Sequence, residues 1–218
     1  MNPEFWHERW QRNEIGFHQQ EINLHLQGYW REVGVDAGAC VLVPLCGKSR
    51  DMLWLAGAGH RVLGVEISPL AVQAFFDENG LVPEVSAAGP FESRRCGEIE
   101  ILCGDFFALA RERLRDVGAV YDRASLVALP PEMRRDYAAH LTQLLAPGTP
   151  VLLVTMDYPQ EQMNGPPFSV TADEVHALYD AAFDVRVLAE VDILGENPRF
   201  RERGLTRLLE QVFLLQRR

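Results

Sequence analysis

A glycine-containing turn and an acidic residue 19 positions further along are the first residues of this chain whose types and spacing suggest chemistry. The turn covers residues 43–49, Val-Pro-Leu-Cys-Gly-Lys-Ser, and its Gly47 would let a ligand approach the backbone closely. Glu66 stands where a carboxylate can accept both hydroxyl hydrogens of a ribose. Taken alone, residues 43–49 could form an ordinary tight turn, and Glu66 could be an ordinary solvated carboxylate at a strand end. Together the two features favour an adenosyl- or dinucleotide-type cofactor.

The same turn contains Gly47-Lys48-Ser49, a tripeptide that also occurs in phosphate-binding loops. Such a loop needs another glycine five residues before Gly47, but position 42 is Leu. The Gly-x-Gly-x-x-Gly pattern of dinucleotide-binding turns is missing as well. We therefore discount an NTPase, and a dinucleotide pyrophosphate is less expected at this turn than at a typical glycine-rich one.

Two further candidates follow later apolar runs. Asp105 and Phe106 could contact an adenine, the carboxylate through the exocyclic amine and the ring through the base, although a turn Asp beside a core Phe is equally compatible. Arg123, in the segment Tyr-Asp-Arg-Ala-Ser, could offer a fixed cation to a carboxylate or another anionic substrate. A surface arginine is the ordinary alternative for Arg123.

Aromatic residues crowd the amino-terminal segment. Phe5, Trp6 and Trp10 share one helical face, which ordinary packing against a sheet would explain. The functional alternative is an aromatic lid, in which an indole face would attract a sulfonium cofactor through a cation–π contact. The loop 165–168, Gly-Pro-Pro-Phe, could form a wall of a substrate pocket, and Arg199 could add an anion contact or simply belong to a charged hairpin tip.

These candidates need a scaffold, and apolar runs alternate with helix signals along the chain. We expect strands over residues 39–43, 61–66, 99–103, 118–122, 150–156, 185–194 and 206–216. We expect helices over residues 49–58, 68–79, 108–115, 130–146 and 171–182, and a short hairpin or loop over 84–97. Ser68-Pro69 and the pair Thr171 and Glu174 are the clearest helix starts.

This alternation predicts an α/β fold with a doubly wound, mostly parallel sheet. No helix signal separates the last two strands, so they should pair as an antiparallel carboxy-terminal hairpin. In such sheets ligands bind at the carboxyl ends of the strands. The candidates named above follow those ends, which is why we expect them to share one site.

Composition excludes several functions. The 21 Lys and Arg against 31 Asp and Glu give a net charge of -10, so nucleic acid and anionic membranes are poor partners. No apolar run is long enough for a membrane span or a signal peptide. The four cysteines lack metal-ligand spacing, so we expect no metal and reduced thiols in a cytoplasmic protein. The length of 218 residues suits a single domain, 1–218, with an amino-terminal extension or lid over 1–30.

Five segments in order resemble the thiopurine S-methyltransferase family in its bacterial form, and the resemblance covers essentially the whole chain. They are Gly-Phe-His-Gln at 16–19, Pro-Leu-Cys-Gly-Lys at 44–48, Gly-Val-Glu-Ile-Ser at 64–68, Asp-Arg-Ala-Ser-Leu-Val-Ala at 122–128 and Gly-Pro-Pro-Phe at 165–168. The resemblance implies a seven-stranded class I methyltransferase fold, which is Rossmann-like, and S-adenosylmethionine as the methyl donor.

By the same resemblance, the cofactor contacts would be Trp10, Leu45, Glu66 and Arg123, with Asp105 and Phe106 near the adenine. Phe17 and Arg199 would bind the substrate, and Arg123 would act in catalysis. The implied acceptors are small thiols such as thiopurines, and also selenium or tellurium species. We expect a monomer. A nicotinamide-dependent oxidoreductase and a catalytically silent nucleotide-binding module stay open as alternatives.

Overall fold

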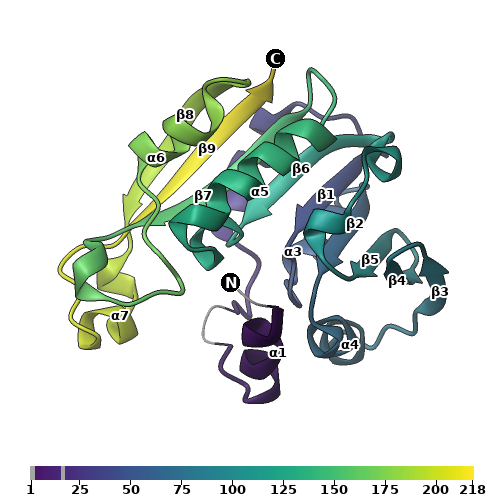
Figure 1. Ribbon diagram of the computed structural model, residues 1–218, viewed down its shortest axis with the longest axis horizontal. Helices are drawn as coiled ribbons and strands as arrows, with labels where there is room; N and C mark the ends of the chain where they lie inside the picture. The colour runs from purple at the N-terminus through teal and green to yellow at the C-terminus, as the bar shows by residue number, and fades with distance from the viewer. Residues whose placement is uncertain (1–2, 16–17) are drawn as a thin grey trace. The chain divides into compact units, whose positions relative to one another are not determined.

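The computed structural model describes residues 3–15 and 18–218, which divide into two compact units, Met1–Tyr121 and Asp122–Arg218 (Figure 1). The single-domain boundary 1–218 and the lid over 1–30 stay predictions. Among the described residues, no helix has both the length and the apolar character needed to cross a membrane.

The first unit is built on strands in the order β3-β4-β5-β2-β1-β6. The strands are β1 (Cys40–Pro44), β2 (Arg61–Glu66), β3 (Glu84–Ala88), β4 (Phe91–Cys96), β5 (Ile99–Cys103) and β6 (Val117–Arg123), whose last two residues open the second unit. Neighbours among β5, β2, β1 and β6 run parallel, whereas β3 and β4 form an antiparallel hairpin (Figure 1). All five residues of β1 are buried, as expected for a central parallel strand. The parallel strands therefore end together at one edge of the sheet.

Helices connect these strands and precede them. They are α1 (Pro3–Gln11), α2 (Leu24–Tyr29), α3 (Asp51–Gly57) and α4 (Pro69–Glu78), with 3-10 turns η1 (Trp30–Val33), η2 (Phe106–Ala108) and η3 (Arg111–Leu114). Ser68 caps α4 as predicted, because its hydroxyl accepts the N–H of Ala71 at 3.3 Å. Ser68 lies two residues after Glu66, so α4 begins almost directly after β2 ends.

The second unit holds an antiparallel group of strands in the order β7-β9-β8. These are β7 (Pro150–Asp157), β8 (Phe183–Asp192) and β9 (Leu209–Arg217); the helices are α5 (Pro131–Leu144), α6 (Ala172–Tyr179) and α7 (Pro198–Glu202), and the 3-10 turns are η4 (Leu126–Ala128), η5 (Gln160–Gln162) and η6 (Leu194–Glu196). The antiparallel pairing of β8 and β9 confirms the predicted carboxy-terminal hairpin. The mostly parallel α/β fold is also confirmed, and the 84–97 segment is the hairpin β3–β4.

Three local predictions were wrong. Residues 108–115 form no α-helix: η2 ends at Ala108 and η3 follows, because only Leu109 and Leu114 are buried and cannot form a continuous apolar stripe. The helix expected over 49–58 begins only at Asp51, with Arg50 as its amino-terminal cap, although the Ser49 hydroxyl accepts the N–H of Asp51. The last two strands are separated by the short helix α7, so Arg199 lies on a helix and not at a hairpin tip.

Candidate functional site

The turn after β1 has an unusual backbone. Leu45 has a φ of 47° and Gly47 a φ of 54°, so two residues lie in the left-handed region, and only one of them is a glycine. The N–H of Cys46, between them, donates to the carbonyl of Val65 on β2 at 3.0 Å. Left-handed backbone at a non-glycine residue costs about 1–3 kcal/mol and persists only where the surroundings fix it. The turn is thus held in one conformation at the carboxyl ends of β1 and β2.

Glu66 closes this turn from the end of β2. Its side chain is only 6% exposed, and its two oxygens accept the N–H groups of Gly47 and Ser68, each at 2.8 Å. Burial raises the pKa of the Glu66 carboxyl, and the hydrogen bonds from Ser68 and Gly47 partly counter that rise. Each carboxylate oxygen has a second lone pair that can accept another hydrogen bond. Glu66 therefore has a fixed orientation and spare acceptor capacity, which a ribose diol requires.

Trp10 lies against the same turn. A Cβ atom on Gly47 would lie 3.3 Å from Cζ2 of the Trp10 indole, so only a glycine leaves the ring in ordinary contact. One turn earlier on α1, Nε2 of His7 lies 3.1 Å from the carbonyl oxygen of Ile67. These two contacts hold α1 over the loops that follow β1 and β2. Trp10 therefore lies against the turn after β1, and the lid stays a prediction.

Lys48 does not behave as a phosphate-binding lysine. Its ammonium group forms an ion pair with Glu78 at the end of α4, with a nitrogen–oxygen distance of 2.6 Å. The ammonium therefore links the turn to α4. A phosphate-binding lysine would instead point toward a bound phosphate.

The loop after β5 reaches Glu66 through its backbone, because the N–H of Gly104 donates to the Glu66 carbonyl at 2.8 Å. The exposed carboxylate of Asp105 accepts the N–H of Phe107 at 3.0 Å and starts η2. Phe106 is only 5% exposed and belongs to the core, whereas Phe107 is 37% exposed. The ring with accessible surface is therefore Phe107 and not the predicted Phe106, and the adjacent pair of phenylalanines was the sequence signal for it.

Two of the remaining candidates, Arg123 and Arg199, belong to the second unit. Arg123 ends β6, is half-buried, and its side chain has neither a hydrogen bond nor an ion pair within the described ranges. Arg199 lies on α7, where its guanidinium carbon is 4.8 Å from the centre of the Phe200 ring. Phe17 lies outside the described residues. The structure therefore brings Trp10, Leu45 and Glu66 together, and the roles of all the candidates stay predictions.

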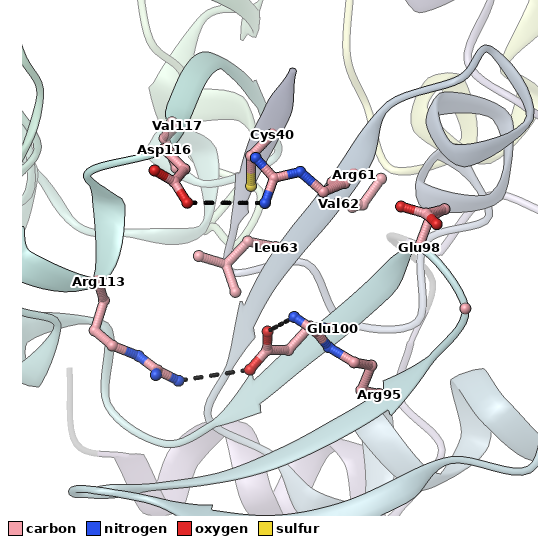
Figure 2. A pocket seen from close by; sticks show the side chains of 11 residues that line it. Cys40, Arg61, Val62, Leu63, Arg95, Glu98, Glu100, Arg113, Asp116 and Val117 are labelled. Carbon is pink, nitrogen blue, oxygen red and sulfur yellow. Dashed lines mark hydrogen bonds and ion pairs between the residues drawn. The ribbon is translucent and has the colours of Figure 1, made fainter. Parts of the chain in front are cut away.

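A separate hollow of about 160 Å³ lies at the other end of the first unit's strands (Figure 2). Cys40 and Arg61, the first residues of β1 and β2, line it, so it is at the opposite end of these strands from Leu45 and Glu66. The arginines that line it already face carboxylates: Arg61–Asp116 at 3.9 Å, Arg95–Glu100 at 2.8 Å and Arg113–Glu100 at 3.5 Å (Figure 2). The charges of this hollow thus offset one another. Within residues 3–15 and 18–218, no cluster of His, Cys, Asp or Glu is arranged to hold a metal ion.

Comparison with solved structures identifies the fold class. A SAM-dependent methyltransferase from Anabaena variabilis aligns with a TM-score of 0.68 at 14% identity, covering 100% of this chain and 96% of that one. A phosphoethanolamine N-methyltransferase of Haemonchus contortus, solved with S-adenosyl-L-methionine, aligns with a TM-score of 0.61 at 9% identity over 88% of this chain and 51% of that one. Both likenesses concern the fold, which is that of class I methyltransferases.

Sequence comparison supplies the family. The family model described as "Thiopurine S-methyltransferase (TPMT)" matches residues 1–218. A thiopurine S-methyltransferase of Nitrosospira multiformis is 55% identical over 218 residues, covering 100% of this chain and 99% of that protein. One of Pseudomonas fluorescens is 51% identical over 213 residues, covering 98% of each chain. Since these matches span the whole length, the chain belongs to the thiopurine S-methyltransferase family and is an S-adenosylmethionine-dependent methyltransferase.

Proposed function

We propose that this enzyme transfers the methyl group of S-adenosylmethionine to the sulfur of small aromatic or heterocyclic thiols, with thiopurines as model acceptors. Selenium and tellurium species are further candidates, because they are soft nucleophiles as thiolates are. The observation that carries the proposal is Arg123: its guanidinium is half-buried and makes no ion pair among the described residues, so it can stabilise an anionic acceptor.

The residues at the end of β1 and β2 fit the cofactor. We assign the ribose to Glu66, whose oxygens are oriented by Gly47 and Ser68 and keep free lone pairs. The indole of Trp10, which covers Gly47, can interact with a sulfonium through its face. Leu45 would contact the cofactor from its strained turn, and Asp105 with an adjacent phenylalanine would contact the adenine. When bound, S-adenosylmethionine supplies an electrophilic methyl group on a positively charged sulfur.

The chain's contribution to the reaction would be orientation and charge. Aromatic thiols ionise readily, so the acceptor needs no strong base to lose its proton. A guanidinium beside the sulfur favours the thiolate over the thiol, which is the role we assign to Arg123. Holding the nucleophile in line with the methyl group removes much of the entropic barrier of a two-molecule reaction. We also propose that Phe17 and Arg199 contact the acceptor.

Cellular context belongs to the same proposal. The four cysteines are free, which agrees with a reducing cytoplasm, and the net charge of -10 disfavours nucleic acid as a substrate. We propose a cytoplasmic monomer that acts on small molecules, and detoxification of soft nucleophiles as its role.

One assay tests this function. Methyl transfer is measured for an anionic thiol, a neutral thiol, a selenol and tellurite with the wild-type enzyme and Arg123→Ala. Arg123→Ala should lower kcat/KM about 10- to 100-fold for the anionic thiol, as expected for one lost charged contact, and much less for the neutral thiol. Arg135→Ala is the matched control, because Arg135 is exposed on α5. An unchanged kcat/KM for the anionic thiol in Arg123→Ala would contradict the role of Arg123.

The alternatives give different results. The oxidoreductase hypothesis is not supported, since the family match identifies a methyltransferase. A silent binding module would bind S-adenosylhomocysteine in calorimetry but methylate no member of the panel. That combination would refute the proposed activity.

A further inference from the structure

Asp122, the residue before Arg123, has no role in the proposed function, yet its surroundings are unusual for an acidic side chain. β6 runs through both residues, and neighbouring side chains on a strand point to opposite faces. Asp122 accordingly is fully buried while Arg123 is half-buried. An acidic side chain in the interior, directly behind a candidate catalytic cation, calls for a physical reason.

The Asp122 carboxylate connects the strand to the turn and to α5. Its Oδ2 accepts the hydroxyl of Tyr137 on α5 at 2.6 Å. Hydrogen bonding from Ser125 also lowers the pKa of this carboxyl, whereas its Oδ1 has no hydrogen-bond partner among the described residues. Between Asp122 and Ser125 the chain passes through Ala124, a non-glycine residue with a φ of 70°. The carboxylate thus spans a strained turn that begins immediately after Arg123.

A second side chain of α5 holds the continuation of this turn. Arg134 is 1% exposed, and its Nε donates to the carbonyl oxygens of Leu126 at 3.1 Å and Leu129 at 2.8 Å. Its Nη1 is 2.7 Å from both carboxylate oxygens of Glu174 on α6. The segment after Arg123 is therefore fixed on both sides, and Asp122 provides the contact nearest to the guanidinium.

We propose that Asp122 is a positioning residue: its buried carboxylate fixes the turn that carries Arg123 and so holds the guanidinium ready for the acceptor. This inference rests on the proposed role of Arg123. A buried carboxylate is costly compared with a neutral side chain, so its presence fits a requirement for geometry better than one for stability.

The ionisation of Asp122 offers a way to test this role. Burial raises the pKa of Asp122 to about 6, against the lowering effect of hydrogen bonds from Tyr137 and Ser125. The groups that face it are the hydroxyls of Tyr137 on α5 and Ser125 in the turn, and Tyr179 on α6, whose pKa the Asp122 charge raises in addition to burial. Protonation removes the negative charge that strengthens the hydrogen bond from Tyr137, so the turn should loosen below about pH 6.

The experiment compares pH profiles of kcat/KM for one thiol. The wild-type profile should have an acid limb near pH 6, and Tyr137→Phe should move it upward by about one pH unit, because one stabilising hydrogen bond is lost. Tyr179→Phe is the matched control. The Tyr179 hydroxyl has no hydrogen-bond partner in the described part of the chain, so the acid limb of the variant's kcat/KM profile should lie at the wild-type pH. Ionisation of the thiol is common to all three proteins and cancels. A limb at the same pH in wild type and Tyr137→Phe would overturn the proposal.

A second readout needs no turnover. The Nε–H signal of Arg123 in NMR, assigned by its loss in Arg123→Lys, should titrate near pH 6 in wild type and stop titrating in Asp122→Asn. A signal that titrates alike in both proteins would overturn the positioning role, whereas failure of the thiol panel alone would refute only the proposed acceptor class. If Asp122→Asn does not fold, Tyr137→Phe should still move the midpoint of the Arg123 signal upward, and an unmoved midpoint would overturn the role.

Discussion

Replacement of Glu66 by Gln separates the cofactor role of this carboxylate from its structural role. Both oxygens accept a backbone N–H at 2.8 Å, from Gly47 and from Ser68. In Glu66→Gln one oxygen becomes an NH2 group, so a donor faces a donor at one of these positions. One buried donor without a partner costs about 1–3 kcal/mol. Since burial raises the pKa of Glu66, removal of its charge offsets part of this loss.

We therefore expect Glu66→Gln to lose about 1 kcal/mol of stability, or about 2–4 °C in Tm for a chain of this size. The loss in cofactor binding should be larger, because the ribose loses a charged acceptor worth about 1.5–3 kcal/mol. This corresponds to an affinity for S-adenosylhomocysteine about 10- to 150-fold weaker. Thermal unfolding measures the first quantity, and isothermal titration calorimetry measures the second.

Glu78→Gln is the matched control for the same turn. Glu78 pairs with Lys48 at 2.6 Å, but its side chain is 52% exposed, so the substitution should change stability by about 0–1 kcal/mol. Its affinity for S-adenosylhomocysteine should equal that of the wild type. If Glu66→Gln binds S-adenosylhomocysteine as tightly as Glu78→Gln does, Glu66 only holds the turn, and its assignment to the ribose is wrong.

Three further outcomes follow from the structure. Trp10→Ala should weaken S-adenosylmethionine binding more than S-adenosylhomocysteine binding in calorimetry, by about 0.5–2 kcal/mol, because only the former is a sulfonium; equal losses would indicate a packing role. Phe107→Ala should weaken cofactor affinity while leaving Tm nearly unchanged, whereas Phe106→Ala should lower stability by about 3–5 kcal/mol, since Phe106 is buried. For Asp122, a folded-state pKa of about 6 against an ordinary 3.8 means that the wild type loses about 3 kcal/mol of stability as the pH rises from about 4 to 7. Asp122→Asn should lack this loss in urea unfolding, and an identical pH dependence in both proteins would contradict the raised pKa.

The strands and the position of Glu66 were predictable because they depend on local signals. β2 begins and ends where its β-branched run does, at Arg61 and Glu66, and Ser68 caps the following helix as its sequence indicates. The 3-10 turns η2 and η3 were not predictable from charge content, because their form depends on which few side chains find a place in the core. Helix α7 was missed because five residues offer no periodic pattern.

Side-chain orientation in the site was harder to predict than position. An aromatic pair after β5 was visible, but only the turn that Asp105 starts decides that Phe106 is buried and Phe107 exposed. The environment of Asp122 also escaped prediction, since its partner Tyr137 lies 15 residues away on α5. An acidic residue directly after the apolar residues 117–121 of β6 was the available signal for it.

Backbone strain and buried charge occur together at the ends of these strands. Leu45 and Ala124, both non-glycine residues with positive φ, follow β1 and β6 directly, and each would be relieved by glycine. Glu66 and Asp122 are buried carboxyls with raised pKa values, and each hydrogen-bonds to the turn concerned. Either feature alone lowers stability, but a carboxylate that accepts hydrogen bonds from a strained turn limits the conformations the turn can adopt. The pairing of the two features fits the proposed roles of Leu45 and Arg123, because a turn held in one conformation can present these residues in a fixed orientation.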